Sequence, residues 1–191
     1  MVVQIIIYII FFIIGITMGS FFSLATYRIP LKQDILHTRS YCPKCNHKLE
    51  FLDLIPVFSY LFLNGKCRYC KEKISSRYII MEIFSGLLYL FIVISLRVNF
   101  LEITSYEIIK LIYVTLMYAT IFVFFGILKE TKQISGEVLW FGIITHILYI
   151  TYLYILNISV YRYIIYLGLM CILLIWKQII KNRSKNEIKR K

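Results

Sequence analysis

Residues 39–77 read RSYCPKCNHKLEFLDLIPVFSYLFLNGKCRYCKEKISSR, and this stretch decides the fold because it sets two Cys-x-x-Cys pairs in a basic loop between long apolar runs. Two residues between cysteines let both sulfurs approach one ion, and two such pairs complete a tetrahedral shell around Zn²⁺. Thiols in a cytosol stay reduced, which favours a metal over disulfides. The alternatives are two redox pairs or cysteines without a shared role. The spacing predicts a structural zinc site with four ligands: Cys42, Cys45, Cys67 and Cys70.

Composition points to an integral membrane protein. Of 191 residues, 60% are hydrophobic, and three prolines and eight glycines interrupt the chain. The mean hydropathy is +0.75, which excludes an ordinary soluble globule. The net charge of +12 could indicate a nucleic-acid partner, but an excess of basic residues in short loops beside membrane spans is what the positive-inside rule predicts. We therefore expect membrane lipids, and not nucleic acid, as the surroundings of this chain.

Five apolar stretches are close to the length that a helix needs to cross a bilayer, roughly 20 residues. They cover residues 2–27, 78–96, 108–128, 138–156 and 160–176. The predicted fold is an all-α polytopic membrane protein with a small zinc-ribbon-like cytoplasmic insert. Its domains are expected as follows: a first transmembrane helix at 1–27, the tetracysteine insert at 28–77, a bundle of about four helices at 78–176 and a basic cytoplasmic tail at 177–191.

The basic residues predict the orientation. Residues 28–77 contain ten Lys/Arg and residues 177–191 contain seven, while Lys129 and Lys132 lie in the link after the third span. These three segments should share the cytoplasmic side, which places the N-terminus outside and the C-terminus inside. The tail either contacts anionic lipid headgroups or serves only as this topology signal.

Several motifs carry a family resemblance. They are GSFFSLATYRIP at Gly19–Pro30, RSYCPKC at Arg39–Cys45, LDLIP at Leu52–Pro56, GKCRYC at Gly65–Cys70 and ISSRY at Ile74–Tyr78, with Glu82 four residues further on. Together they resemble the opening of bacterial prepilin leader peptidases. The resemblance is specific over roughly residues 15–90 and weaker through the remaining spans.

The resemblance implies a multi-pass enzyme of the bacterial inner membrane with two activities. Members of the family cleave the leader from type IV prepilins and pseudopilins by aspartyl proteolysis, and many methylate the new N-terminal amine with S-adenosylmethionine. The expected partners are therefore prepilins or pseudopilins, and the expected cofactors are structural Zn²⁺ and, by resemblance alone, S-adenosylmethionine.

This chain departs from the family at both catalytic positions. Leu128 falls where the first aspartate is expected, and Ser135 falls at the proline of the following link. No Gly-x-Gly-Asp motif occurs, and the basic tail falls about where it would begin. The sequence contains two aspartates, Asp34 and Asp53, both in the insert. We expect no catalytic residue in this chain, although Glu130 and Glu137 leave a glutamate pair conceivable.

Three functions stay open on this basis. The first is a degenerate or truncated leader peptidase without its own proteolysis. The second is a non-proteolytic prepilin-binding or regulatory zinc module, with a partner subunit that supplies missing parts. The third is a methyltransferase-only descendant, whose methyl-donor site cannot be located from spacing.

Other residues invite a structural interpretation first. Asp53 can form a turn, orient the insert or help to bind substrate. Glu82 is costly in lipid and should pair with Arg77 or with a neighbouring helix. His146 lies inside a span, where hydrogen-bonded packing is expected. Gly15 and Gly19 form a Gly-x-x-x-Gly step that can bring two helices close together.

Overall fold

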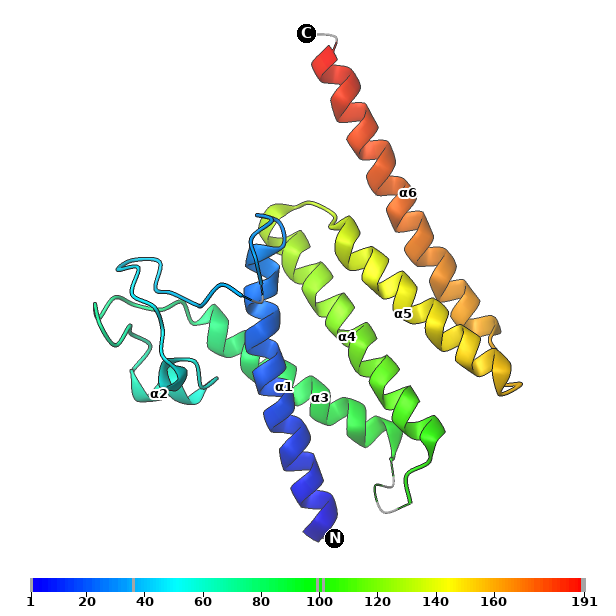
Figure 1. Cartoon of the computed structure of the whole chain (residues 1–191), viewed down its shortest axis with the longest axis horizontal. Helices are drawn as coiled ribbons and strands as arrows, with labels where there is room; N and C mark the ends of the chain where they lie inside the picture. Colours follow the sequence, from blue (N-terminus) through cyan, green and yellow to red (C-terminus); the bar gives the residue numbers. More distant parts are fainter. Residues whose placement is uncertain (1, 36, 99, 101, 190–191) are drawn as a thin grey trace. The chain divides into compact units, whose positions relative to one another are not determined.

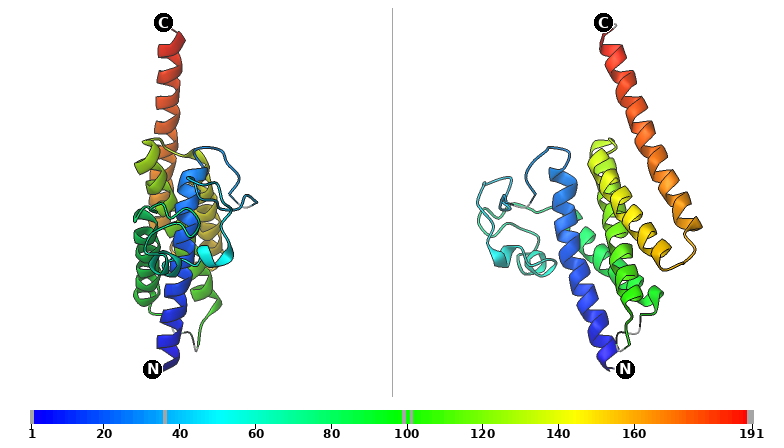
Figure 2. Two further views of the ribbon diagram at one scale, coloured as in Figure 1. Left: turned by 90° about the vertical axis from the view of Figure 1, so that its left-hand side faces the viewer. Right: turned by 45° about the vertical axis from the view of Figure 1, so that its right-hand side comes forward.

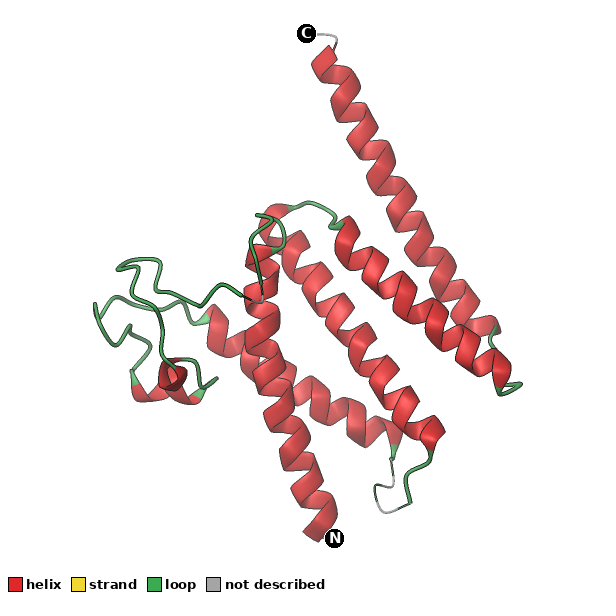
Figure 3. Ribbon diagram, viewed as in Figure 1, coloured by secondary structure: helices red, strands yellow, loops and turns green. Residues whose placement is uncertain are grey.

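A computed structural model describes residues 2–35, 37–98, 100 and 102–189 of the chain, with side chains as far as residue 179. Every regular element within these ranges is helical (Figure 3). Five helices are long and apolar enough to cross a membrane, which confirms the predicted fold class. The chain divides into two compact units, Met1–Leu111 and Ile112–Lys191, and each is described by itself.

The five long helices are labelled in Figure 1: α1 (Val2–Arg28), α3 (Arg77–Leu96), α4 (Ser105–Thr131), α5 (Gly136–Ile155) and α6 (Tyr161–Lys189). Their ends lie within three residues of the predicted ones, except that α6 continues past residue 176. The candidate span in α6 ends at Ile179. Lys, Arg, Gln and Glu are good helix formers, so α6 can continue as a helix beyond its apolar stretch. Most of the predicted basic tail lies outside the described side chains.

The first unit is built on close antiparallel packing of α1 against α3. A Cβ atom added at Gly15 would lie 2.7 Å from the Cβ of Tyr89 and 2.8 Å from the Cα of Gly86. One added at Gly19 would lie 2.6 Å from the Cβ of Ser85. Only glycine permits this approach, so the Gly-x-x-x-Gly step serves the packing role that the sequence suggested.

The insert between α1 and α3 contains two short helices, η1 (Phe51–Asp53) and α2 (Phe58–Phe62). Its remaining backbone forms turns and two isolated bridges, Tyr41 to Lys48 and Lys66 to Lys73. The right-hand view of Figure 2 shows the insert, drawn in cyan, beside the C-terminal half of α1.

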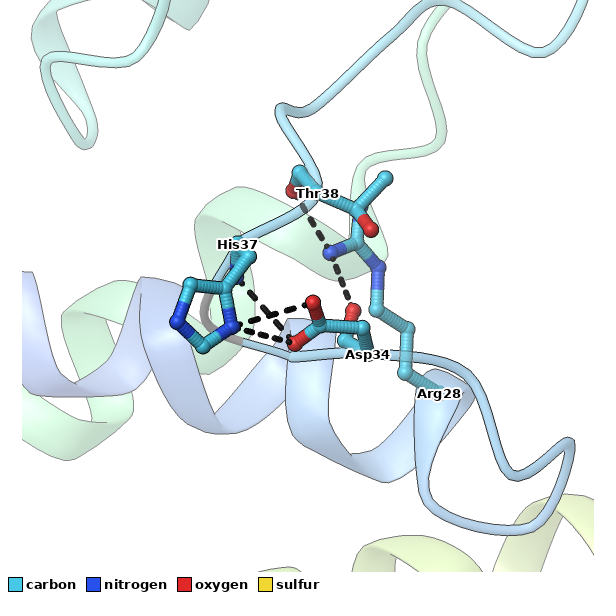
Figure 4. Close-up of polar contacts among 4 residues, drawn as sticks. All are labelled: Arg28, Asp34, His37 and Thr38. Carbon is cyan, nitrogen blue, oxygen red and sulfur yellow. Dashed lines mark hydrogen bonds and ion pairs between the residues drawn. The ribbon is translucent and has the colours of Figure 1, made fainter.

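A buried arginine at the end of α1 holds the start of the insert (Figure 4). Nη1 of Arg28 donates hydrogen bonds to the carbonyl oxygens of Asp34 and Thr38, at 2.9 and 2.8 Å. Nη2 reaches the carbonyl of Arg39 at 3.4 Å. The Asp34 carboxylate accepts the backbone N–H of His37 and contacts its Nδ1. Because a guanidinium carries five donors, one side chain can fix this loop through its backbone.

The second unit contains α5, α6 and most of α4, joined by a polar cluster around His146. This imidazole is fully buried. Its Nδ1 lies 2.7 Å from the hydroxyl of Tyr113 on α4, and its Nε2 lies 2.8 Å from the carbonyl of Tyr163 on α6. Tyr113 also stacks on Tyr149 of α5, with ring centroids 3.9 Å apart. His146 therefore has the expected packing role and ties three helices together.

Candidate metal centre and adjoining cavity

Each cysteine pair lies in a tight turn of the same design. In the first, the N–H of Cys42 donates to the carbonyl of His47, and the N–H of Asn46 donates back to Cys42. The second repeats both hydrogen bonds between Cys67 and the residues five and four positions later. Asn46 and its counterpart Lys71 adopt left-handed backbone angles, with φ of 57° and 60°. The local sequence thus builds two equivalent knuckles that present their sulfurs in the same way.

The knuckles bring all four predicted ligands together. The Sγ atoms of Cys42, Cys45, Cys67 and Cys70 lie within 4.8 Å of one another. Those of Cys42 and Cys70, one from each knuckle, are 3.9 Å apart. A tetrahedron with Zn–S bonds of about 2.3 Å has sulfurs roughly 3.8 Å apart, so the residues fit a zinc ion. The four cysteines are therefore a site that could hold a metal, and His47 is not among its ligand atoms, since it packs against Tyr69 with ring centroids 3.5 Å apart.

The electrostatics of the site favour a first thiolate on Cys42. Backbone N–H groups of Cys45 and Lys44 point at its sulfur and lower the pKa of this thiol to about 7. The N–H of Glu72 acts in the same direction on Cys70, but desolvation and the neighbouring sulfurs outweigh it and raise the pKa of Cys70 to about 11. Four adjacent thiols cannot all ionise without a cation to offset their charge.

Asp53 connects η1 to the second knuckle. Its Oδ1 accepts a hydrogen bond of 2.6 Å from Nε of Arg68. Its Oδ2 accepts the hydroxyl of Tyr69 at 3.1 Å and the N–H of Glu50 at 3.2 Å. Desolvation alone would raise the pKa of Asp53, but these donors outweigh it and hold the pKa below its ordinary value. Of the roles that the sequence left open, the structure supports orienting the insert.

Glu82 connects the insert to the helices. Its Oε2 accepts the N–H of Val57 at 2.7 Å, and Ser20 of α1 donates a second hydrogen bond. Val57 has φ 63° and ψ −53°, and the N–H of Phe58 donates to the carbonyl of Pro56. This is the positive-φ γ-turn, a rare and strained conformation, and most strained for a β-branched residue. The sequence suggested a partner for Glu82 on Arg77 or on a neighbouring helix, and did not identify the Val57 amide.

A cavity of about 460 Å³ lies between the knuckles and the ends of α1 and α3. The residues that line it include Glu82 and Ser23, and the Ser23 hydroxyl is buried and has no hydrogen-bond partner among the described residues. Aromatic rings make up part of the remaining wall: Tyr27, Tyr41, Tyr60 and Tyr78. Nothing in the sequence indicated this cavity, because its walls come from segments up to 62 positions apart.

The residues that the sequence analysis associated with the first catalytic aspartate lie around the link between α4 and α5. Leu128 lies in the last turn of α4, and Ser135 directly precedes α5. Glu130 and Glu137 are exposed at either end of the intervening link. These residues belong to the second unit, whereas the four cysteines belong to the first.

The fold and the site define a class: a multi-pass membrane protein with four clustered cysteines, which could hold a metal ion, in a loop between its first two spans. The family of bacterial Peptidase A24 N-terminal domains matches residues 13–96, which include α1, the insert and α3. This part of the chain is therefore similar to the N-terminal domain of prepilin leader peptidases.

Individual relatives show the same distribution of similarity. The prepilin leader peptidase/N-methyltransferase of Vibrio cholerae is 45% identical over 83 residues, 39% of this chain and 33% of that protein. That of Myxococcus xanthus is 42% identical over 78 residues, 41% of this chain and 23% of that protein. The protein of Aeromonas salmonicida is 24% identical over 162 residues, 72% of this chain and 54% of that protein. The matches thus span from about a quarter to half of these relatives. No solved structure matches the chain.

Proposed function

We propose that this chain is a prepilin leader peptidase-like protein of the bacterial cytoplasmic membrane, which recognises type IV prepilins or pseudopilins but does not cleave them. The match of residues 13–96 to the family supports the recognition. The observation that carries the proposed loss of proteolysis is Leu128, where the resemblance places a family aspartate.

Aspartyl proteolysis requires two neighbouring carboxyl groups, one that activates water and one that donates a proton to the scissile carbonyl. A leucine side chain can do neither. The two aspartates of the sequence lie in the insert and are already engaged, Asp53 with Arg68 and Asp34 with His37. Both contacts support structural roles for these carboxylates.

Coexpression with a prepilin, in cells that lack other leader peptidases, tests the proposal. We expect the intact mass of the pilin to retain the leader, whereas an active family member in the same cells removes it. If the pilin instead loses its leader, and if Glu130→Gln prevents this loss, then a glutamate pair performs the cleavage.

A methyltransferase without protease activity is the second candidate, and the cavity beside Glu82 favours it. Its volume is within the range of small-molecule sites, and a buried carboxylate with tyrosine rings fits the positive sulfonium of S-adenosylmethionine. When bound, this cofactor would supply a methyl group for the N-terminal amine of a pilin. Calorimetry on the purified protein should detect S-adenosylmethionine and a weakened affinity in Glu82→Gln. The absence of heat, with no methyl transfer to a cleaved pilin, would exclude this candidate.

A regulatory zinc module without enzymatic activity predicts stable partners. Crosslinking in native membranes, followed by capture of the chain, should then recover a pilin or a leader peptidase subunit. Recovery of the chain alone would count against this version and leave the methyltransferase to be tested.

The same proposal includes an orientation with the insert, the link at 132–135 and the C-terminus in the cytoplasm. The distribution of Lys and Arg supports it. Green fluorescent protein fused after residue 191 should fluoresce, because the fluorescent protein matures in the cytoplasm and matures poorly when exported by the general secretory route. Activity of alkaline phosphatase fused at the same site would show that the orientation is the reverse.

A further inference from the structure

The insert exposes an unusual amount of apolar surface along Phe51–Leu63, here called the apolar segment. Phe51 is 80% exposed and Phe62 is 83% exposed. Four more apolar side chains of the segment are exposed as well: Leu52, Leu54, Phe58 and Leu61. In a water-soluble domain such a continuous patch would favour aggregation, so a patch of this kind marks a binding or membrane surface.

The apolar segment presents no exposed charge. Its sequence, FLDLIPVFSYLFL, contains one ionisable carboxylate or basic group, Asp53. The Asp53 side chain is only 4% exposed and is paired with Arg68, outside the segment. An unpaired carboxylate would oppose transfer of the segment into lipid, but a paired and enclosed one opposes it far less.

Several backbone N–H groups of the apolar segment also have hydrogen-bond acceptors within the protein. The N–H groups of Leu54, Phe58, Ser59 and Leu61 donate to carbonyl oxygens within the segment. The γ-turn gives the N–H of Val57 no backbone acceptor, and this N–H donates to the Glu82 carboxylate instead. Backbone polar groups that enter lipid must find their hydrogen-bond partners within the protein.

The position of the segment completes the argument. A groove between the insert and α1 is lined by Phe51 and Leu54 on one side and by Thr17, Phe21 and Leu24 on the other. These three α1 residues lie 4 to 11 positions before the end of the helix, or about 6–16 Å along its axis at 1.5 Å per residue. In Figure 1, α2 accordingly lies level with the middle of α1 and not beyond its end. The apolar segment thus lies alongside a membrane span.

We propose that the apolar segment inserts into the bilayer leaflet beside the C-terminal half of α1, so that phospholipid acyl chains cover Phe51, Phe58 and Phe62. An interfacial element of this kind buries its apolar face about 5–10 Å below the headgroups. Lys66 follows the segment, and its ammonium group contacts anionic headgroups. The proposal does not depend on which substrate the protein recognises.

Quenching of tryptophan by brominated lipid tests this insertion in the full-length, zinc-loaded protein. The background variant carries Trp140→Phe and Trp176→Phe, and Phe62→Trp is the reporter. Lys48→Trp, on the first knuckle, is the control for the aqueous part of the insert. Phe91→Trp, exposed on α3 within a span, is the control for acyl-chain contact. All three are reconstituted in phosphatidylcholine and phosphatidylglycerol vesicles, with bromine near the headgroup end of the acyl chains.

We expect bromine to lower the emission of Phe62→Trp by about twofold, as for Phe91→Trp, and to leave Lys48→Trp nearly unchanged. Phe51→Trp is the second reporter, used if the first variant does not bind zinc normally. Emission at long wavelength without quenching would show that the segment lies in water and would overturn the proposal. Emission at short wavelength without quenching would also overturn it, because the cover would then be protein, either a second copy or a pilin.

Discussion

Replacing Gly15 by alanine should separate α1 from α3 and destabilise the first unit. The added methyl group would lie 2.7 Å from the Cβ of Tyr89 and 2.9 Å from the carbonyl oxygen of Ser85. Carbon atoms prefer 3.5–4.0 Å, so the helices must move apart by about 1 Å. Overpacking of this kind costs about 1–3 kcal/mol, and the better helix propensity of alanine returns about 1 kcal/mol. A net loss of up to about 2 kcal/mol follows from these two terms.

Gly168→Ala on α6 is the matched control, because a Cβ atom there meets nothing within 4 Å. This variant should keep its stability or gain up to about 1 kcal/mol. The assay is unfolding of the purified protein by sodium dodecyl sulfate in mixed micelles, followed by circular dichroism. The midpoint should fall for Gly15→Ala and stay or rise for Gly168→Ala. Equal midpoints for the two variants would refute the close packing of α1 on α3.

Three more outcomes follow from the structure. Cys42→Ser, or removal of metal with a chelator, should make the insert sensitive to protease, because metal binding and local folding are coupled. Insertion of the chain into the membrane should be unaffected. Unchanged protease cleavage would argue against a structural metal. Asp53→Asn should speed cleavage of the insert near neutral pH, because the wild-type carboxylate is ionised there and bonded to Arg68. Folding lowers the pKa of Asp53, so the stabilisation by its ionised carboxylate is fully present above the unfolded pKa of about 4. This stabilisation is lost as the pH falls from that value through the lower folded pKa, where the difference between Asp53→Asn and wild type should disappear. His146→Phe should remove the hydrogen-bond acceptor of the Tyr113 hydroxyl and lower the free energy of unfolding by about 1–3 kcal/mol. The same detergent assay measures this loss. An unchanged free energy of unfolding would mean that the cluster does not stabilise the packing of these helices.

Elements with a local signal were predictable from the sequence. The five spans follow from runs of apolar residues long enough to cross a bilayer, and their ends agree with the structure except in α6. The metal centre follows from a spacing, because two residues between cysteines suffice to form one knuckle. The resemblance to leader peptidases depended on short motifs in order, and the family match covers the same part of the chain.

Contacts between distant segments were decided only by the tertiary structure. Glu82 was recognisable as a costly charge in a span, but its acceptance of the Val57 amide depends on a strained turn and on the docking of the insert. The pairing of Asp53 with Arg68 likewise joins segments that no periodicity relates. The sequence also did not indicate that Phe51 and Leu54 of the insert share a groove with α1. Sequence patterns report the local solvent preference of a helix or loop, while the partner of a buried polar group depends on which surfaces meet when the helices pack.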